Sequence, residues 1–300
     1  KPATFNANDT AVGSITKPSL ASNEGMVEGI FYQTFGSGRP VLIINGGPGL
    51  DSAGFEPVAK AIAAKGYQTI LFDQRGTGRS TLPKIDGSTI QMSLMVEDIE
   101  KLRSHLKQPK FTILGHSFGG MLGAAYAAKY PEHVEKLIFS SAGGLDLSFR
   151  EQFSKRFNAN LTLTEQAKMQ AYQLQQAAGD DSAETRDALA LVRAHAYVID
   201  KSKAPAIAAR LKVVNMAING LVYQDLEKIQ FDLKSSFRDF KAPVLVLQGD
   251  KDVISVDTAK TIANSFPDAR LVIISNCAHY GWLDSAELYY ASVFEFIQAP

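Results

Sequence analysis

Cysteine, net charge and long hydrophobic runs are nearly absent from this sequence of 300 residues. A single thiol, Cys277, excludes an internal disulfide and is too little for a cysteine-based structural zinc site. Lysine and arginine number 31, as do aspartate and glutamate, so no long-range field gathers phosphates or anionic lipid headgroups. No apolar run approaches the ~18 residues of a membrane-spanning helix. We therefore expect neither a nucleic acid nor a membrane as a partner.

The first part of the chain bears on its location. The chain begins at Lys1, and Pro2–Ser22 is polar, without the apolar core of a signal peptide. A mature exported protein would begin in this way, and so would a trimmed cytoplasmic one. We favour a periplasmic or secreted protein over a cytoplasmic one. The sequence carries no signal for an oligomeric state.

The remaining composition is that of a globular α/β chain, with 45% hydrophobic and 21% charged residues. Short apolar runs rich in β-branched residues alternate with helical patterns, and they are apolar on both faces, as buried parallel strands are. Such strands are expected at 41–44, 69–72, 111–114, 137–139, 244–247 and 271–274. Met26–Tyr32 and Gln33–Gly36 are expected to pair as an edge hairpin.

Two helices are expected to cover this sheet. From Met92 to Leu106 the apolar residues recur at steps of three and four, which places one apolar stripe against the strands. From Phe118 to Tyr130 small residues allow close approach to the strands, and Pro131 ends the helix.

The alternation stops in residues 148–238, which read as a helical block. Thr162 with Glu165, and Asp181 with Glu184, have the spacing of a capping box and predict two helix starts. The strand rhythm resumes after Pro243. We therefore predict a mostly parallel sheet domain formed by residues 1–147 and 239–300, with residues 148–238 inserted as a helical cap.

The sharpest chemical signal is Gly115-His116-Ser117-Phe118-Gly119, directly after a predicted strand and before a predicted helix. A serine hydroxyl is a weak nucleophile unless it is exposed beside a base, and a strained strand-to-helix turn exposes it. The helix N-terminus also points backbone N–H groups at the place where negative charge would develop. An incidental serine in a tight turn is the alternative, but the strand, turn and helix together favour Ser117 as a nucleophile.

A base and an acid follow in the order that such a nucleophile requires. His279 lies in the loop after the last strand, where an imidazole could serve as the base. Asp250 and Asp252 both follow the strand 244–247. We favour Asp252, because it lies further into the loop and can turn back across the strand ends, whereas Asp250 is better placed to shape the turn. Asp252 would hold the tautomer of His279 and stabilise its imidazolium form.

A glycine-rich loop, Asn45-Gly46-Gly47-Pro48-Gly49, follows the strand 41–44. In a serine hydrolase the second oxyanion donor comes from this loop, so we expect the N–H groups of Gly47 and Phe118 to form the oxyanion hole. A plain turn or a phosphate-binding loop is the alternative. The second lacks the lysine and the glycine spacing that phosphate loops require.

Three motifs together closely resemble the proline iminopeptidase family of α/β-hydrolases: Gly46-Gly47-Pro48-Gly49, the stretch from Asp73 to Ser80 (DQRGTGRS), and Gly115 to Gly120. The resemblance covers the sheet domain. It implies an α/β-hydrolase fold, an oxyanion hole in the first loop, a helical cap, and Ser117, Asp252 and His279 as the triad.

The sequence also departs from that family. Asn45 stands where members usually have histidine, and the cap has no clear match to the acidic motifs that hold the free α-amine of the substrate. An ammonium entering a partly dry pocket needs a carboxylate partner.

Three functions therefore stay open. The one we favour is a serine hydrolase of the proline iminopeptidase type, an aminopeptidase of short peptides. The second is an esterase or lactonase of small acyl substrates, and the third is a non-catalytic ligand-binding protein with the hydrolase fold. We expect a small molecule or a short peptide as substrate, with no metal and no cofactor.

Overall fold

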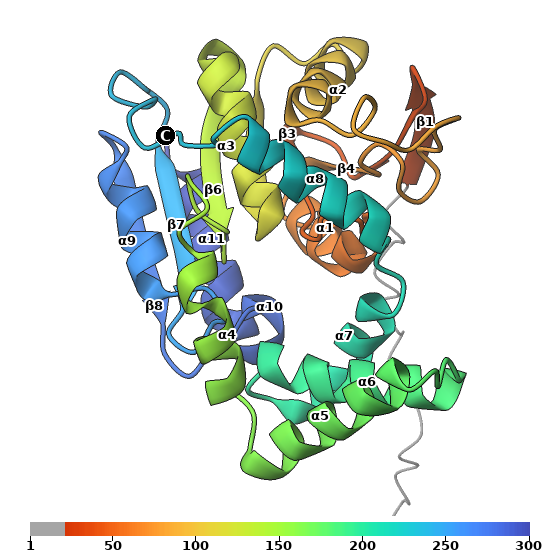
Figure 1. The fold of residues 1–300 in the computed structure, drawn as a ribbon. Helices are drawn as coiled ribbons and strands as arrows, with labels where there is room; N and C mark the ends of the chain where they lie inside the picture. Colours follow the sequence, from red (N-terminus) through yellow and green to blue (C-terminus); the bar gives the residue numbers. More distant parts are fainter. Residues whose placement is uncertain (1–21) are drawn as a thin grey trace, which may run out of the picture.

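The computed structural model describes residues 22–300, and its framework is one sheet of eight strands in the order β1-β2-β4-β3-β5-β6-β7-β8 (Figure 1). The strands β3 to β8 run parallel to one another, and β1 and β2 add an antiparallel edge. The strands are β1 Ser22–Val27, β2 Ile30–Phe35, β3 Arg39–Ile44, β4 Tyr67–Phe72, β5 Phe111–His116, β6 Val134–Ser140, β7 Val244–Gly249 and β8 Ala269–Ile274. The segment Pro2–Ser22, which motivates the expectation of export, lies outside the described residues except for Ser22.

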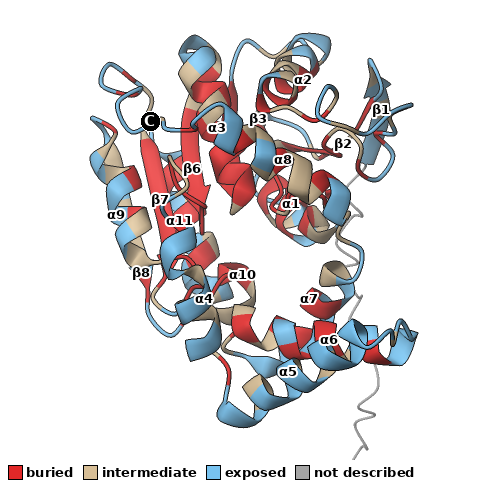
Figure 2. Ribbon diagram, in the orientation of Figure 1, coloured by how far each residue is buried: buried red, intermediate tan, exposed pale blue. Residues whose placement is uncertain are grey.

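The central strands are buried on both faces, as the continuous apolar runs predict (Figure 2). Along β3 the side chains alternate: Leu42 and Ile44 pack in one core cluster, and Val41 and Ile43 in the other. This period of two sends each strand's side chains to both sides of the sheet. All six predicted strands are present, and each is longer than predicted.

The predicted edge hairpin forms, but its turn was placed wrongly. The turn lies at Glu28-Gly29, both at positive φ (46° and 84°), and not between Tyr32 and Gln33. Two successive residues at positive φ suit the twist of a two-residue hairpin, and Gly29 adopts that conformation without steric cost. The glutamate at the first position conceals the turn in the sequence.

Helices cover each face of the sheet. The helices α2 (Met92–His105), α3 (Phe118–Lys129) and α9 (Val256–Asn264) pack in the first cluster, and α1 (Glu56–Ala63), α10 (Gly281–Asp284) and α11 (Ala286–Gln298) in the second. Both helices expected from the sequence are present within one residue of their predicted ends. Each of the helices in the described chain is too short or too polar to span a bilayer.

The segment between β6 and β7 is helical throughout, and Figure 1 shows α5 to α7 apart from the helices that flank the sheet. Its helices are α4 Arg150–Ala159, α5 Leu163–Ala177, α6 Ala183–Ala194, α7 Ala204–Leu211 and α8 Met216–Lys228. Helices α6 and α7 share a small core of their own, whereas the buried side chains of α8 belong to the main cluster. We refer to residues 148–238 as the inserted segment, and its limits as a domain stay a prediction.

The two predicted helix starts differ in outcome. Thr162 caps α5 with the full reciprocal capping box to Glu165, as the spacing predicts. The start predicted at Asp181 was wrong by one residue, because Ser182 is the residue whose side chain accepts the N–H of Thr185. Aspartate and serine are both good caps, so the sequence could not choose between neighbours.

The DQRGTGRS stretch forms the loop after β4 and is held by buried polar contacts. The Asp73 carboxylate accepts the N–H and hydroxyl of Ser52 (2.9 and 2.8 Å) and the N–H of Arg79 (2.9 Å). Arg75 donates twice to Asp98 of α2, at 2.7 and 2.8 Å, and both side chains are largely buried. This loop therefore connects the segment before α1 to α2.

We predict that Asp98→Ala lowers the free energy of unfolding by about 3 kcal/mol or more, because it leaves the Arg75 guanidinium buried without a counter-charge. The double variant Arg75→Met, Asp98→Leu should recover most of that loss, since no charge stays buried. Urea unfolding of both variants measures the difference. A double variant as unstable as Asp98→Ala would contradict this account.

Candidate active site

Ser117 occupies a sharp turn between β5 and α3. Its backbone has φ 53° and ψ −123°, a conformation that costs free energy for a residue with a side chain. The turn is held at the sheet: the Ser117 N–H donates to Ser140 O at 3.0 Å, and Ser117 O accepts the N–H groups of Gly120 and Gly143. The surrounding structure thus fixes the strained conformation predicted for this serine.

Glycines make this turn sterically feasible. A Cβ on Gly115 would lie 2.4 Å from Gly119 O, and a Cβ on Gly119 would lie 2.1 Å from Ile44 O. No side chain fits at either distance. The helix α3 can therefore start directly against the ends of β3 and β5 only with glycine two residues before and two residues after Ser117.

His279 and Asp252 form a buried pair. His279 Nδ1 lies 2.7 Å from Asp252 Oδ1, and the two residues are 5% and 0% exposed. Asp252 also accepts the N–H of Ile254 at Oδ1 and the amide of Gln248 at Oδ2 (3.1 and 2.8 Å). A carboxylate acts here as acceptor, so Nδ1 carries the proton and Nε2 is left as the basic nitrogen of the neutral imidazole.

Asp250 lies elsewhere and has a different part. Its carboxylate accepts the N–H of Cys277 at 3.3 Å, and its own N–H donates to Ile274 O. These bonds shape the turn after β7, which is the part that the sequence suggested for it. Cys277 is fully buried, and burial raises the pKa of its thiol to about 12, so it behaves as a small apolar residue.

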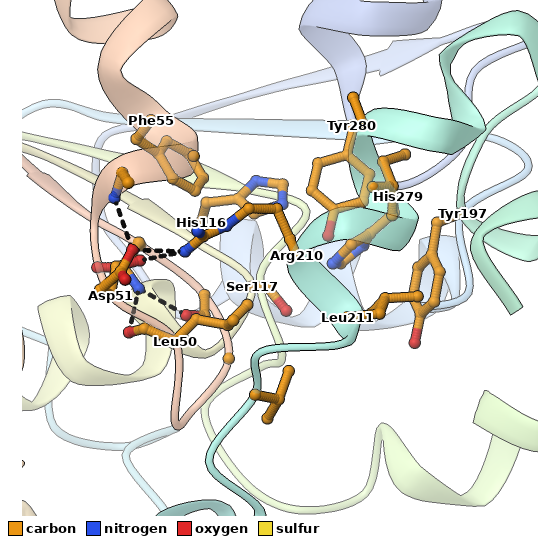
Figure 3. Close-up of a pocket in the computed structure, with 18 of the residues that line it drawn as sticks. Leu50, Asp51, Phe55, His116, Ser117, Tyr197, Arg210, Leu211, His279 and Tyr280 are labelled. Atoms are coloured by element: carbon orange, nitrogen blue, oxygen red, sulfur yellow. Dashed lines mark hydrogen bonds and ion pairs between the residues drawn. The ribbon is translucent and has the colours of Figure 1, made fainter. Parts of the chain in front are cut away.

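Ser117 and His279 line one cavity of about 510 Å³ (Figure 3). Within residues 22–300 the Ser117 hydroxyl and the His279 ring share this cavity without a hydrogen bond between them. In serine enzymes this contact is often long before substrate binds. The structure thus brings the three residues to one site, with the His279–Asp252 bond already formed.

The glycine-rich loop lies against the serine. A Cβ on Gly46 would lie 3.0 Å from the Ser117 Cβ, and Gly47, at φ 134°, lines the cavity. Phe118 is the first residue of α3 and is buried, so its N–H is among the unpaired donors of a helix start. Both N–H groups chosen from the sequence therefore belong to elements that meet at Ser117.

Asn45 shapes this loop from inside. Its amide nitrogen donates to Gly46 O and Leu50 O (2.8 and 3.0 Å), and its backbone carbonyl accepts the Gln74 amide at 2.9 Å. The Asn45 residue that departs from the resembled family thus spans the loop, and Gln74 ties it to the DQRGTGRS stretch.

His116 also belongs to the site, although the sequence indicated only that it precedes Ser117. Burial, with the nearby His279, holds the pKa of its imidazole well below its usual range, so it stays neutral. Its Nδ1 lies 3.0 Å from Ser140 Oγ, and its ring packs between His279 and Trp282 at centroid distances of 4.8 and 5.0 Å. A neutral aromatic wall next to His279 adds no charge to oppose an imidazolium.

The inserted segment supplies much of the cavity wall, and no motif marks these residues. Tyr197, Tyr223 and Asn219 belong to it, and Tyr280 adds a further phenol, whose pKa burial raises to about 12. The charged residues among the lining side chains are Asp51 and Arg210, which pair at 2.6 Å (Figure 3). The rest of the lining is mainly aliphatic and aromatic.

The comparisons with known proteins agree with this geometry. Residues 39–286 match the family described as alpha/beta hydrolase fold, and the chain belongs to that family. It is 26% identical to a proline iminopeptidase of Heyndrickxia coagulans over 281 residues, covering 90% of this chain and 95% of that protein. A proline iminopeptidase of Saccharolobus solfataricus is also 26% identical, covering 89% of this chain and 87% of that protein.

Solved structures show the same fold. A proline iminopeptidase from Mycobacterium smegmatis has a TM-score of 0.69 at 22% identity, covering 92% of this chain and 97% of that one. An esterase from Exiguobacterium antarcticum has a TM-score of 0.67 at 20% identity, covering 90% and 96%. The predicted α/β-hydrolase fold and the resemblance to proline iminopeptidases are thus confirmed, and the chain is classed as a serine hydrolase.

We predict that Gly119→Ala lowers the free energy of unfolding by about 3 kcal/mol or more, because its Cβ would overlap the Ile44 carbonyl. Gly220 on α8 is the matched control: a Cβ there meets nothing within 4 Å. Gly220→Ala should leave stability unchanged or raise it by up to ~1 kcal/mol. Urea unfolding compares the two, and equal stabilities would contradict the steric argument.

Proposed function

We propose that this protein hydrolyses acyl compounds by covalent catalysis at Ser117. The observation that carries the proposal is the buried His279–Asp252 hydrogen bond, next to a serine held in a strained turn of the same cavity. His279 Nε2 takes the hydroxyl proton as Ser117 Oγ bonds to the acyl carbon. The leaving group departs with that proton. His279 then takes a proton from a water molecule whose oxygen bonds to the acyl carbon, the bond from that carbon to Ser117 Oγ breaks, and Ser117 regains the proton as the acid is released.

The remaining groups have electrostatic parts in this proposal. The Asp252 carboxylate keeps the proton of the neutral imidazole on Nδ1 and stabilises the imidazolium form. The N–H groups of Gly47 and Phe118 donate to the oxyanion of the tetrahedral intermediate, where one donor typically contributes about 3 kcal/mol. An idle binding protein with this fold is the weaker candidate, because the strained serine and the buried pair have no use in binding alone.

The charge of the cavity favours small esters or lactones with an uncharged acyl group. A free α-amine needs a carboxylate partner, and the acidic side chain among the lining residues, Asp51, is already paired with Arg210. Mainly apolar walls instead suit an aliphatic or aromatic acyl group. A prolyl aminopeptidase is the second candidate, and the names of the relatives in sequence favour it.

We predict that Ser117→Ala lowers kcat by something on the order of a million-fold, because no other group supplies the nucleophile. A fluorophosphonate probe should label wild-type protein at Ser117, as mass spectrometry of the labelled peptide would show. Ser154→Ala, which alters an exposed serine of α4, is the control and should keep both properties. Folded wild-type protein that stays unlabelled would favour the non-catalytic protein.

The substrate class is tested with p-nitrophenyl butyrate, proline p-nitroanilide and N-acetylproline p-nitroanilide. We expect the ester to have the highest kcat/KM and acetylation of the amine to cause no loss. Arg210→Met should raise the kcat/KM of the amine-bearing substrate relative to the ester by up to about fivefold, because it frees the Asp51 carboxylate. A partly exposed ion pair of this kind contributes up to ~1 kcal/mol.

The double variant Asp51→Asn, Arg210→Met is the matched control and should cancel that gain. The aminopeptidase would instead show a preference of wild-type protein for proline p-nitroanilide and loss of that activity on acetylation.

A further inference from the structure

The inserted segment holds the loop that carries Asp252. From α4, Arg156 Nε donates to Asp252 O at 2.7 Å, and Arg156 Nη2 donates to Asp250 O at 3.0 Å. Asn160, at the end of α4, donates to Lys251 O at 2.6 Å. The backbone carbonyls of all three successive loop residues are therefore bound by two side chains of the inserted segment.

Arg156 uses its charge on this loop. Among the described residues it is in none of the ion pairs, and it is only partly exposed. Its planar guanidinium presents two parallel donors, which suits two carbonyls of one turn. Hydrogen bonds from a charged donor are shorter and stronger than neutral ones. A guanidinium directed at peptide carbonyls, with no carboxylate partner, is therefore a strong clamp on the turn.

At Asp252 the backbone hydrogen bond within the loop is long. The Asp252 N–H reaches Gly249 O at 3.3 Å, which is long for a turn, while its carbonyl takes the 2.7 Å bond from Arg156. The Cα of Asp252, which bears the carboxylate side chain, lies between this N–H and this carbonyl. The direction in which its carboxylate meets His279 Nδ1 therefore depends on α4 as well as on the Ile254 N–H and the Gln248 amide, which the carboxylate accepts.

The inserted segment holds the other loops of the site as well. The His279 N–H donates to Tyr197 O at 3.0 Å. On the glycine-rich loop, the Asn219 amide donates to Pro48 O at 2.9 Å, and the Asn215 N–H donates to Gly49 O at 2.9 Å. The loops that bear the acid, the base and the oxyanion donor are thus each hydrogen-bonded to the inserted segment.

We propose that the inserted segment is a clamp that sets the geometry of the catalytic loops, with Arg156 as the positioning residue for Asp252 and Asn219 as that for the oxyanion loop. This proposal rests on the proposed function. Neither side chain reacts: Arg156 acts through Asp252 on His279, and Asn219 acts through Pro48 on the neighbouring Gly47 N–H. The inserted segment then contributes to kcat, besides covering the substrate.

We call the action of Arg156 on Asp252 the acid arm of the clamp. It is tested by proton NMR and steady-state kinetics on Arg156→Met. A proton shared between His279 Nδ1 and Asp252 gives a far-downfield signal, which reports the pair without turnover. We expect Arg156→Met to shift or broaden that signal and to lower kcat by roughly 10- to 100-fold with KM little changed, as small misplacements of catalytic groups do. Arg156→Lys keeps the charge but not the two parallel donors of the guanidinium. Its signal and kcat should lie between those of wild-type protein and of Arg156→Met.

Lys155→Met is the matched control, because Lys155 is the exposed neighbour on α4 with the same charge. It should leave both the signal and kcat unchanged. A wild-type signal and wild-type kcat in Arg156→Met would overturn the acid arm, and so would an equal fall in kcat in Lys155→Met. Urea unfolding checks that the variants are folded. If Arg156→Met does not fold, the same measurements on Arg156→Lys decide the test.

We call the action of Asn219 on the glycine-rich loop the oxyanion arm of the clamp. It is tested with Asn219→Asp, which keeps the size of the side chain but removes the donor to Pro48 O. We expect a fall in kcat of roughly 10-fold or more with the downfield signal unchanged, because the His279–Asp252 pair is not touched. Gln224→Ala, at an exposed position of α8, is the control. An unchanged kcat in Asn219→Asp would overturn this arm.

Different results would contradict the proposed function and the clamp. Absence of fluorophosphonate labelling at Ser117 in folded wild-type protein would remove the proposed function. Labelled wild-type protein whose NMR signal and kcat ignore Arg156 would remove the clamp alone.

Discussion

The site depends on one steric constraint, the contact between the start of α3 and the ends of β3 and β5. A peptide carbonyl of β3 lies where a side chain of Gly119 would be, and this close approach leaves Ser117 in a conformation that an L residue rarely adopts. Once the helix starts there, its first N–H groups and the glycine-rich loop after β3 converge on one point. The nucleophile and its oxyanion donors are thus consequences of a single close packing.

The parallel sheet explains why the rest of the site gathers at the same place. The loops after β3, β5, β7 and β8 all leave from the carboxyl ends of parallel strands, which lie at one edge of the sheet. Residues separated by more than a hundred positions, such as Ser117 and His279, therefore line one cavity. The buried Asp252 is costly alone, but it is satisfied by His279, Gln248 and the Ile254 N–H.

The inserted segment has more than one connection to this edge. Its helices α6 and α7 have a small core of their own, but Arg156, Tyr197 and Asn219 each bind a different loop of the site. Hydrogen bonds to three loops distinguish this segment from a lid that is joined only at its two ends. The same segment lines the cavity and pairs Arg210 with Asp51, so it affects both the geometry of the catalytic loops and the charge that a substrate meets.

Much of this followed from the sequence because its signals are local. The β-branched runs, the stripe from Met92 and the Thr162 cap each depend on neighbouring residues, and they predicted the strands and helices correctly. The motif around Ser117 contains its own steric explanation, since the glycines that the turn requires are within two residues of the serine. Where two neighbours could do the same task, as Asp181 and Ser182 could cap α6, or where a glutamate took the first turn position of the hairpin, local signals failed.

The tertiary structure alone decided which distant groups meet. Arg156 is one of many basic residues in a solvated helix pattern, and only the fold shows that its guanidinium lies on the carbonyls of Asp250 and Asp252. The pairing of Asp51 with Arg210 likewise joins residues far apart in the chain and sets the charge of the cavity. Sequence determines local conformation through steric and hydrogen-bonding preferences of adjacent residues, whereas such long-range contacts depend on how whole elements pack, which no short pattern records.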